Sequence, residues 1–289
     1  MSLFSVNTKE QLAFLLKVLP VEIDEVLADR RKYLRSFRIS KPNGASRLVY
    51  DPQGPLKLLQ QKIKTHILDS VPLPNCVHGG VRCRSVLTNA APHVGKEFVF
   101  CLDIKDFFPG IGPTLVGTIF RALGFGPGVV DSLVSATTWD NHLPQGLATS
   151  TGLANLAMAR VDLRLQTLAC KQSFDYTRWI DDLTLSGRRR LLNFERLILR
   201  IVAEGGFSVN PDKVQMMHSG MQQVVTGVVV NRKLNVPRAE RNRIRREVLQ
   251  FRASKHDSEA TFQRIRGKVS WISQVNPSLG ARLETRLSR

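Results

Sequence analysis

Three aspartates stand at places in the sequence where they could bind divalent metal ions. Asp103 follows a short apolar run, and Asp181 and Asp182 are adjacent between two further apolar runs. Neighbouring carboxylates raise each other's pKa, so such a pair is unfavourable unless a cation lies between them. Mg²⁺ prefers a few carboxylates together with phosphate oxygens, and two such ions can stabilise a phosphoryl displacement. A single Asp is also a common turn former, so the pair alone indicates little.

Short strands are expected to carry these carboxylates. Residues 98–104 (FVFCLDI) predict a buried strand, and residues 174–186 predict two strands joined at Asp181-Asp182. Helices are expected at residues 8–29 with a break at Pro20, and at 55–68, 114–123, 149–167 and 191–203. Hairpins are expected at residues 33–50 and at 224–236, the second turning at 231–233, and residues 124–128 are expected to be a plain loop.

Composition restricts the class of protein. The chain has 289 residues with a formal net charge of +18, and 43% of the residues are hydrophobic. That hydrophobic content excludes a largely disordered chain, and the charge favours a polyanionic partner, nucleic acid before an acidic membrane. No apolar run approaches the ~18 residues that span a bilayer, and the N-terminus lacks the pattern of a signal peptide. We therefore expect a cytoplasmic protein with no membrane partner.

Four segments occur in an order that matches a known enzyme family. They are LDIKDFFPGI (102–111), LPQGLATSTGLANL (143–156), YTRWIDDLTLSG (176–187) and GFSVNPDK (206–213). This order resembles motifs A, B, C and D of the reverse transcriptase palm. The chain departs from the usual Tyr-Ala-Asp-Asp of motif C, because Trp179-Ile180 precede the two acids.

Further segments narrow the resemblance to bacterial retron-type reverse transcriptases. Residues 38–47 resemble the start of the fingers in bacterial reverse transcriptases, and residues 78–85 resemble their next block. Asn89-Ala90-Ala91-Pro92-His93 matches the NAxxH element of retron enzymes, and Val225-Thr226-Gly227 matches their VTG element. The resemblance covers nearly the whole chain.

The resemblance implies an α+β, right-hand polymerase fold, with fingers, a palm built of an antiparallel sheet packed on helices, and a small helical thumb. Residues 1–97 would form the fingers with N-terminal helices, 98–236 the palm with part of the fingers, and 237–289 the thumb. The implied activity is RNA-directed DNA synthesis of the retron type. A cognate structured noncoding RNA would serve as template and primer, and the product would be branched multicopy single-stranded DNA.

The implied cofactor is Mg²⁺, as two ions, with Mn²⁺ as an alternative. Retron systems usually serve antiphage defence, so a separate effector protein is an expected partner beside the RNA, its DNA product and dNTPs. Two other hypotheses stay open. One is a group II-like or other bacterial defence reverse transcriptase without branched priming, and the other is a catalytically silent RNA-binding scaffold.

The resemblance also assigns residues to the reaction. Asp103, Asp181 and Asp182 would bind metal, and Lys213 would donate a proton to pyrophosphate, although it could equally be a surface lysine. Phe108 resembles the steric gate that excludes a ribose 2′-OH, with a core phenylalanine as the alternative. The other implied contacts to the incoming nucleotide come from Lys41, Arg47, Gln145 and Gly146, since Arg and Lys bind phosphate and Gly permits close approach.

A further group of residues is expected to meet nucleic acid. The region from Pro237 to Arg289 holds 13 Lys and Arg residues against 5 Asp and Glu residues, which favours a nucleic-acid contact over a solvated helix face. The retron-type elements and the aromatic residue of motif C join this group. The expected contacts are Asn89, His93, Trp179, Thr226, Gly227, Arg264, Arg266 and Lys268.

Overall fold

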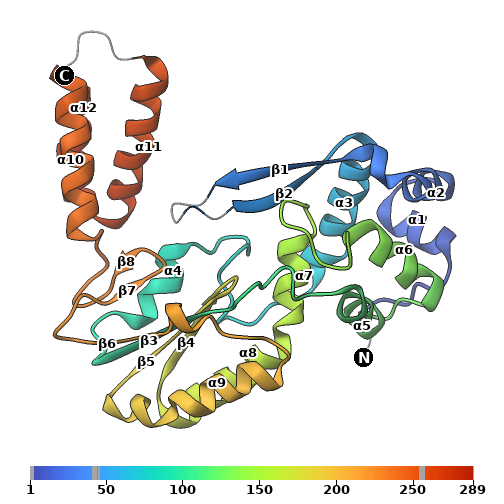
Figure 1. Cartoon of the computed structure of the whole chain (residues 1–289), viewed down its shortest axis with the longest axis horizontal. Coiled ribbons are helices and arrows are strands. Elements are labelled where there is room, and N and C mark those ends of the chain that lie inside the picture. Colours follow the sequence, from blue (N-terminus) through green and yellow to red (C-terminus); the bar gives the residue numbers. More distant parts are fainter. Residues whose placement is uncertain (1–2, 41–43, 45, 254–257, 289) are drawn as a thin grey trace. The chain divides into compact units, whose positions relative to one another are not determined.

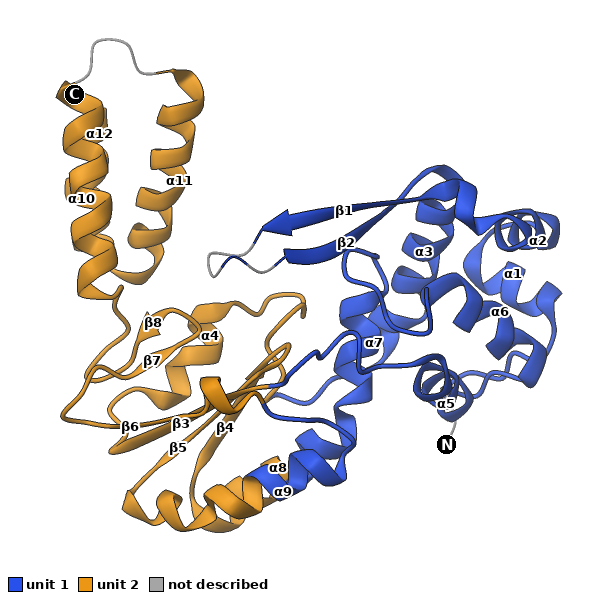
Figure 2. Cartoon of the chain, viewed as in Figure 1, with its two compact units in different colours: residues 1–75, 104–164, 199–209 blue, residues 76–103, 165–198, 210–289 orange. Residues whose placement is uncertain are grey.

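The computed structural model describes residues 3–40, 44, 46–253 and 258–288 of the chain, and Figure 1 shows their arrangement. The chain divides into two compact units, which Figure 2 colours separately. Unit 1 comprises residues 1–75, 104–164 and 199–209, and unit 2 comprises residues 76–103, 165–198 and 210–289. These units do not follow the boundaries expected at residues 97 and 236, because residues 76–97 pack with the sheet of unit 2.

Unit 1 contains six complete α-helices among the described residues and one two-stranded hairpin. Its helices are α1 (Lys9–Leu16), α2 (Pro20–Ala28), α3 (Gly54–His66), α5 (Pro113–Leu123), α6 (Pro127–Thr137) and α7 (Ser150–Ala157). A capping box between Thr8 and Gln11 begins α1, and Pro20 begins α2, which confirms the expected break. The hairpin pairs β1 (Leu34–Ser40) with β2 (Ser46–Pro52).

Helix α6 was not expected from the sequence. The sequence predicts a plain loop over residues 124–128 and no helix directly after it. Gly124 has a left-handed φ of 102° and ends α5, while Gly126 is the N-cap and Pro127 the first residue of α6. Glycine after one helix and proline at the start of the next are the usual signals for these positions.

Unit 2 is built on a four-stranded antiparallel sheet in the order β4-β5-β3-β6. The strands are β3 (Phe98–Asp103), β4 (Asp175–Trp179), β5 (Asp182–Gly187) and β6 (Gln215–His218). Figure 1 shows α8 (Ala159–Gln172) and α9 (Glu195–Glu204) along one side of the sheet and the short α4 (Val86–Ala90) on the other. The expected helix 149–167 is thus divided into α7 and α8 at Met158.

The two faces of the sheet differ in character. On β3, Phe100 and Leu102 point to one face, whereas Val99, Cys101 and Asp103 point to the other, because side chains alternate along a strand. Val99 and Cys101 pack against the core formed with the C-terminal helices. Asp103 therefore lies on the face that carries α4, at the end of its strand.

Three helices end the chain: α10 (Arg238–Ala253), α11 (Glu259–Val275) and α12 (Pro277–Leu287). Their apolar side chains, among them Ile244, Val269 and Leu283, share one core with Val225 and Val228. The strands β7 (Val224–Val225) and β8 (Val228–Val229) connect these helices to the sheet. Here the expected turn was misplaced. The hairpin reverses at Thr226-Gly227, both with positive φ, and only a single bridge between Val229 and Asn235 spans residues 231–233.

Candidate active site

The three aspartates expected to bind metal meet at one end of the four-stranded sheet. Asp103 is the last residue of β3, and Asp182 is the first residue of β5 directly opposite it in the antiparallel register. Residues so paired have Cα atoms about 4.5–5.5 Å apart. Asp181 precedes Asp182 in the turn between β4 and β5. The strands thus hold two carboxylates face to face and place the third beside them.

The turn that carries Asp181 has an unusual conformation. Trp179 pairs with Asp182, so Ile180 and Asp181 form a two-residue loop, and Ile180 has a φ of 58°. A left-handed conformation is rare for a β-branched residue and costs about 1–3 kcal/mol unless its surroundings hold it. The sequence departure at this position, Ile in place of the usual Ala, therefore falls on the most strained residue of the site.

Two neighbours hold this turn in place. The guanidinium of Arg178, whose side chain is fully buried, donates a 2.7 Å hydrogen bond to the carbonyl oxygen of Ile180. Gly79 lies against the turn, and a Cβ there would approach both the backbone nitrogen and Cγ1 of Ile180 to 2.5 Å. The backbone of Arg178 bonds to Cys76 and His78 on the same segment. Residues 76–79 therefore fix the turn, a role that the sequence did not reveal.

The surroundings of Asp182 strongly perturb the pKa of its carboxyl group. Burial, followed by the charges of Asp181 and Asp103 and a side-chain hydrogen bond with Asp103, raises the pKa of Asp182 to about 7. A carboxyl group that titrates near neutral pH among other carboxyls is typical of a functional site. Three ionised carboxylates in this arrangement repel one another, and a positive charge bound among them offsets that repulsion.

Lys213 already supplies one positive charge. Its Nζ lies 2.8 Å from Oδ1 of Asp103, and the hydrogen bond raises the pKa of Lys213. The segment that carries Lys213 is held to the sheet because the N–H of Asn210 donates to the carbonyl oxygen of Asp103. The Asn210 side chain also caps the turn Pro211–Lys213. The structure thus brings Lys213 together with the three aspartates.

The donor set fits a hard divalent cation. The oxygens of Asp103, Asp181 and Asp182 are the type of ligand that Mg²⁺ prefers. Burial and then repulsion from the other two carboxylates raise the pKa of Asp182, and a cation would offset both effects. In the described part of the chain no group of three or more His, Cys, Asp or Glu side chains is arranged so that it could hold a metal ion. Mg²⁺ usually takes only one or two protein carboxylates and completes its shell with water and substrate phosphates.

The residues expected to meet the incoming nucleotide belong to unit 1. The N–H of Tyr50 on β2 donates a 2.8 Å bond to the carbonyl oxygen of Gln145, which fixes the motif B loop to the hairpin. Gly146 has a φ of 109°, and a Cβ there would collide with the carbonyl oxygen of Tyr50. Oε1 of Gln145 is buried and has no hydrogen-bond partner among the described residues. Arg47 is exposed on β2, and Lys41 lies outside the described residues.

Phe108 sits on a compact turn that follows motif A. Its ring lies 5.6 Å from that of Phe107, edge to face, and it is only half-buried. Phe107 is buried and packs on Phe207, with ring centroids 5.6 Å apart. Phe107 is therefore the core residue of the pair, and part of Phe108 remains exposed.

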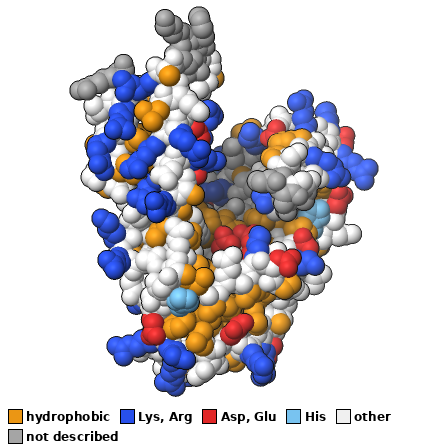
Figure 3. All heavy atoms as spheres, turned by 60° about the vertical axis from the view of Figure 1, so that its left-hand side comes forward, with side chains coloured by type: hydrophobic (Ala, Val, Ile, Leu, Met, Phe, Trp, Pro, Cys, Tyr) orange, Lys and Arg blue, Asp and Glu red, His pale blue; other side chains and the backbone are white. Residues whose placement is uncertain are grey.

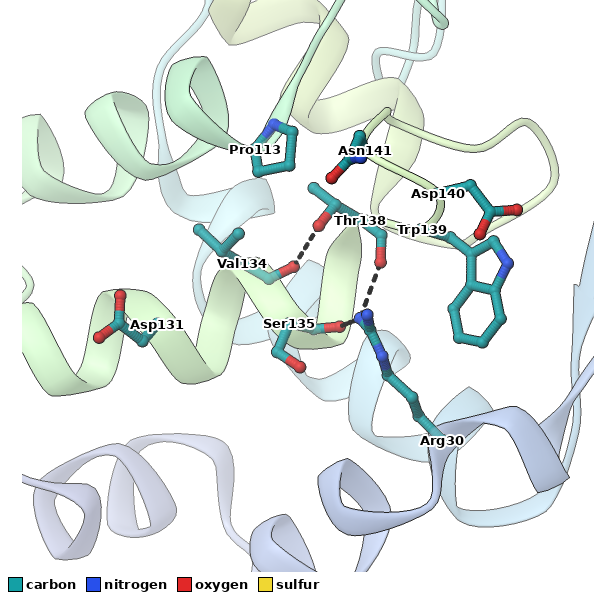
Figure 4. A pocket seen from close by; sticks show the side chains of 9 residues that line it. All are labelled: Arg30, Pro113, Asp131, Val134, Ser135, Thr138, Trp139, Asp140 and Asn141. Atoms are coloured by element: carbon teal, nitrogen blue, oxygen red, sulfur yellow. Dashed lines mark hydrogen bonds between the residues drawn. The ribbon is translucent and has the colours of Figure 1, made fainter.

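A pocket of about 470 Å³ in unit 1 shows how the motif B loop is supported (Figure 4). Arg30 donates to the carbonyl oxygens of Ser135 and Thr138 at the end of α6, and its guanidinium lies 4.9 Å from the ring centroid of Trp139. Trp139 pairs with His142 across a tight turn. Arg30 thus positions the loop that leads to Gln145, although 115 residues separate the two in sequence and no spacing could have indicated it.

The retron-type elements form an internal network. His93 is completely buried between the hydroxyl groups of Ser186 and Thr177, at 2.7 and 2.8 Å. The amide group of buried Asn89 donates to the hydroxyl of Thr226. Burial lowers the pKa of His93 to about 3, so its ring is neutral.

This burial corrects the expected roles of Asn89 and His93. Asn89 and His93 were expected to meet nucleic acid, yet in this structure neither side chain reaches the surface. They instead connect α4 to the sheet and to the β7–β8 turn. Thr226 is half-buried and Gly227 is exposed at that turn, and Trp179 is half-buried beside Asp182.

The basic residues of α11 are also placed differently from expectation. Arg264 and Lys268 make ion pairs with Glu247 of α10, at 3.0 and 2.7 Å, and only Arg266 is exposed without an acidic partner among the described residues. Figure 3 shows further Lys and Arg side chains along these helices. On α10, Arg238, Arg245 and Arg246 are exposed and form no ion pair with another described residue. The charge available for phosphate is therefore greater on α10 than on α11.

Comparison with known proteins agrees with this geometry. The family model described as reverse transcriptase (RNA-dependent DNA polymerase) matches residues 39–236. A solved telomerase from Candida albicans, in complex with a fragment of telomeric RNA, superimposes with a TM-score of 0.50 at 9% identity, over 91% of this chain and 59% of that chain. At that identity the likeness concerns the fold alone. The fold is thus the right-hand polymerase fold, and the class is that of the reverse transcriptases.

Sequence relatives define the family more closely. The chain is 35% identical to the retron Mx65 reverse transcriptase of Myxococcus xanthus over 89% of its length, and it spans 65% of that protein. It is 30% identical to the retron Ec86 reverse transcriptase of Escherichia coli, over 91% of this chain and 82% of the relative. The chain belongs to the retron reverse transcriptases.

Proposed function

We propose that the chain is an RNA-directed DNA polymerase of the retron type. The main support for the proposal is that Asp103, Asp181 and Asp182 lie together at one end of an antiparallel sheet, with Lys213 beside them. Phosphoryl transfer requires groups that stabilise negative charge on oxygens at fixed positions. A strand pair and a tightly held turn provide fixed positions.

The aspartates and Lys213 would have different roles in the reaction. Asp103, Asp181 and Asp182 would hold two Mg²⁺ ions, or Mn²⁺ as an alternative, which when bound supply charge stabilisation at the attacking and leaving oxygens. Lys213 would give a proton to the leaving pyrophosphate. Its contact with Asp103 raises its pKa, so the ammonium form is the one present at neutral pH.

The nucleotide would be recognised by residues of unit 1. The unpartnered Oε1 of Gln145 offers a hydrogen-bond acceptor. Gly146 would meet the nucleotide through its backbone, and glycine is required there because a Cβ would collide with the carbonyl oxygen of Tyr50. Arg47 is exposed on the hairpin and would bind the triphosphate, together with Lys41. Template and primer would be RNA and the growing DNA strand.

Phe108 is expected to exclude ribonucleotides. Changing Phe108 to Val should lower the preference for dNTPs over rNTPs by about tenfold or more, because a smaller side chain opens space for the 2′-OH. Incorporation of both nucleotide types by the variant and the wild type would be compared. Phe107→Leu serves as the control, since its effect should fall on stability. An unchanged nucleotide preference in the Phe108 variant would make this residue part of the core instead.

We expect the grip on the template–primer duplex to come from α10 more than from α11. The double variant Arg245→Gln/Arg246→Gln should make the log–log salt dependence of duplex binding shallower by about 1.5, since each lost phosphate contact removes roughly 0.7–0.9. The matched double variant Arg264→Gln/Lys268→Gln loses the same charge, yet it should change the slope much less, because both side chains are already held in ion pairs with Glu247. If the two double variants changed the salt slope equally in binding titrations, the assignment of the duplex contact to α10 would be contradicted.

A more specific proposal concerns the RNA template and the product of the polymerase. A cognate structured noncoding RNA would serve as template and primer and would be converted into branched multicopy single-stranded DNA, within an antiphage system that includes a separate effector protein. What supports this proposal is membership of the retron reverse transcriptases together with the Asn89–Thr226 link between the two retron-type elements. Within the described residues no helix is long and apolar enough to cross a membrane.

Two measurements test the proposed polymerase activity and the proposed branched product separately. Purified protein with Mg²⁺, dNTPs and a primed RNA template should extend the primer, and failure to do so would favour an RNA-binding scaffold. Sequencing the nucleic acid that co-purifies from the host should yield DNA covalently joined to one defined RNA. Recovery of unbranched DNA with an otherwise active enzyme would favour a reverse transcriptase without branched priming.

A further inference from the structure

Three consecutive arginines lie at the end of the four-stranded sheet that is remote from the catalytic carboxylates. Strand β5 begins at Asp182 and ends at Gly187, and Arg188, Arg189 and Arg190 follow it with exposed side chains. At about 3.4 Å per residue, β5 separates this end of the sheet from Asp182 by roughly 17 Å. The arginines therefore form a surface distinct from the active site.

The positive charge of this surface is not neutralised by its neighbours. The guanidinium groups of Arg188 and Arg189 have no hydrogen-bond or ion-pair partner in the described part of the chain, and Arg190 lies 5.8 Å from the ring centroid of Phe194. The nearby acids are otherwise engaged. Glu97 accepts the backbone N–H of Arg189, and Asp175 pairs with Lys96 at 2.5 Å. The guanidinium groups of the three arginines thus have no carboxylate partner among the described residues and could bind an anion.

The surface is suited to a phosphate backbone and poorly suited to unpaired bases. Binding of single strands relies on aromatic rings on which successive bases stack. Phe194, the aromatic residue that follows the arginines, is already in contact with Arg190 on one side and with Phe174 at 5.5 Å. RNA duplexes are instead recognised through shape, phosphates and 2′-hydroxyl groups, for which exposed arginines suffice.

We infer that Arg188, Arg189 and Arg190 bind the backbone of a folded RNA stem that is not the segment being copied. The inference rests on the proposed function, since it takes RNA as the partner. The distance from Asp182 means that an RNA held here has to extend well beyond the template–primer junction. The arginines would thus tether a structured RNA while the active site copies another part of it.

Substitution of the three arginines tests the inference with an RNA hairpin whose stem has about 16 base pairs, the length that a double-stranded RNA-binding domain covers. Arg188→Gln/Arg189→Gln/Arg190→Gln should bind this hairpin about tenfold or more weakly, with a salt slope shallower by about two. The triple Lys variant should retain most of the affinity. Extension of a short primed template should proceed at the wild-type rate, because the carboxylates and Lys213 are untouched.

A matched variant separates a local site from the general charge of the protein. Lys17→Gln/Arg31→Gln/Lys57→Gln removes the same charge from exposed positions of unit 1 and should leave hairpin binding nearly unchanged. An equal loss in this variant, no loss in the arginine variant, or a larger loss for single-stranded RNA or anionic lipid vesicles would overturn the inference. If the wild-type protein bound the hairpin through these arginines but extended no primer, the proposed function would fail and the binding surface would stand.

Discussion

Replacement of Asp181 by Asn is expected to abolish DNA synthesis and to leave RNA binding intact. The change keeps the size of the side chain but removes a charge from the group of carboxylates in which metal ions would bind. Loss of about 4 kcal/mol of transition-state stabilisation corresponds to a rate lower by roughly three orders of magnitude. RNA binding should persist because the basic side chains of α10 and of Arg188 to Arg190 are unchanged. Single-turnover primer extension and filter binding would measure the two properties separately.

Asp103→Asn should have the same effect, and it tests one further point. Asp103 also holds Lys213, so this variant removes both a carboxylate and the partner of the proposed proton donor. Asp106→Asn is the matched control, because Asp106 is exposed and its φ of 46° is tolerated by Asn. Synthesis close to the wild-type rate by the Asp181 variant, or a comparable loss in the Asp106 control, would contradict the assignment of the active site.

The sequence allowed prediction of those parts of the site that rest on local chain order. Asp103, Asp181 and Asp182 occupy strand ends that apolar runs identify, and the structure brings them together with Lys213 as the order of motifs implied. The right-hand fold was predicted correctly from the same motifs. The fold prediction succeeded because it depends on a family-wide order of segments. The positions of the three aspartates follow from apolar runs next to them in sequence, and their roles in catalysis stay a prediction.

Other features depend on contacts that no local pattern encodes. Arg30 supports the motif B loop, and Gly79 leaves space for the strained Ile180, in each case across about a hundred residues of chain. The same limitation applies to α11. The charges of Arg264 and Lys268 suggested free phosphate ligands, but the packing of two helices brings Glu247 between them. Net charge in a segment does not reveal which charges are already paired.

The elements NAxxH and VTG illustrate a different limit. Their presence correctly indicated the family, but it did not indicate whether their side chains face RNA or the interior. Burial of His93 between two hydroxyl groups, and the bond from Asn89 to Thr226, show an internal connection between α4, the sheet and the β7–β8 turn. A motif can therefore identify a family while its residues act within the protein.

Asp182 should make the metal-free protein less stable as the pH rises, and Asp182→Asn should remove that effect. In the folded protein, burial and the neighbouring carboxylates raise the pKa of Asp182 from 3.8 to about 7. Between these two pH values the folded state holds a proton that the unfolded state has released, so stability falls with increasing pH. Above pH 7 both states are ionised and the full penalty remains, at most about 4 kcal/mol.

Thermal unfolding in EDTA would measure this effect at pH 5 and at pH 8. The variant should exceed the wild type in melting temperature by several degrees at pH 8 and by much less at pH 5, because the Asn side chain offers Asp103 a hydrogen-bond donor at every pH. Addition of Mg²⁺ at pH 8 should raise the melting temperature of the wild type more than that of the variant, since a cation offsets the same repulsion. Parallel pH dependences for the two proteins would show that Asp182 is not held among charged carboxylates, and the cation-binding role of this end of the sheet would lose its electrostatic basis.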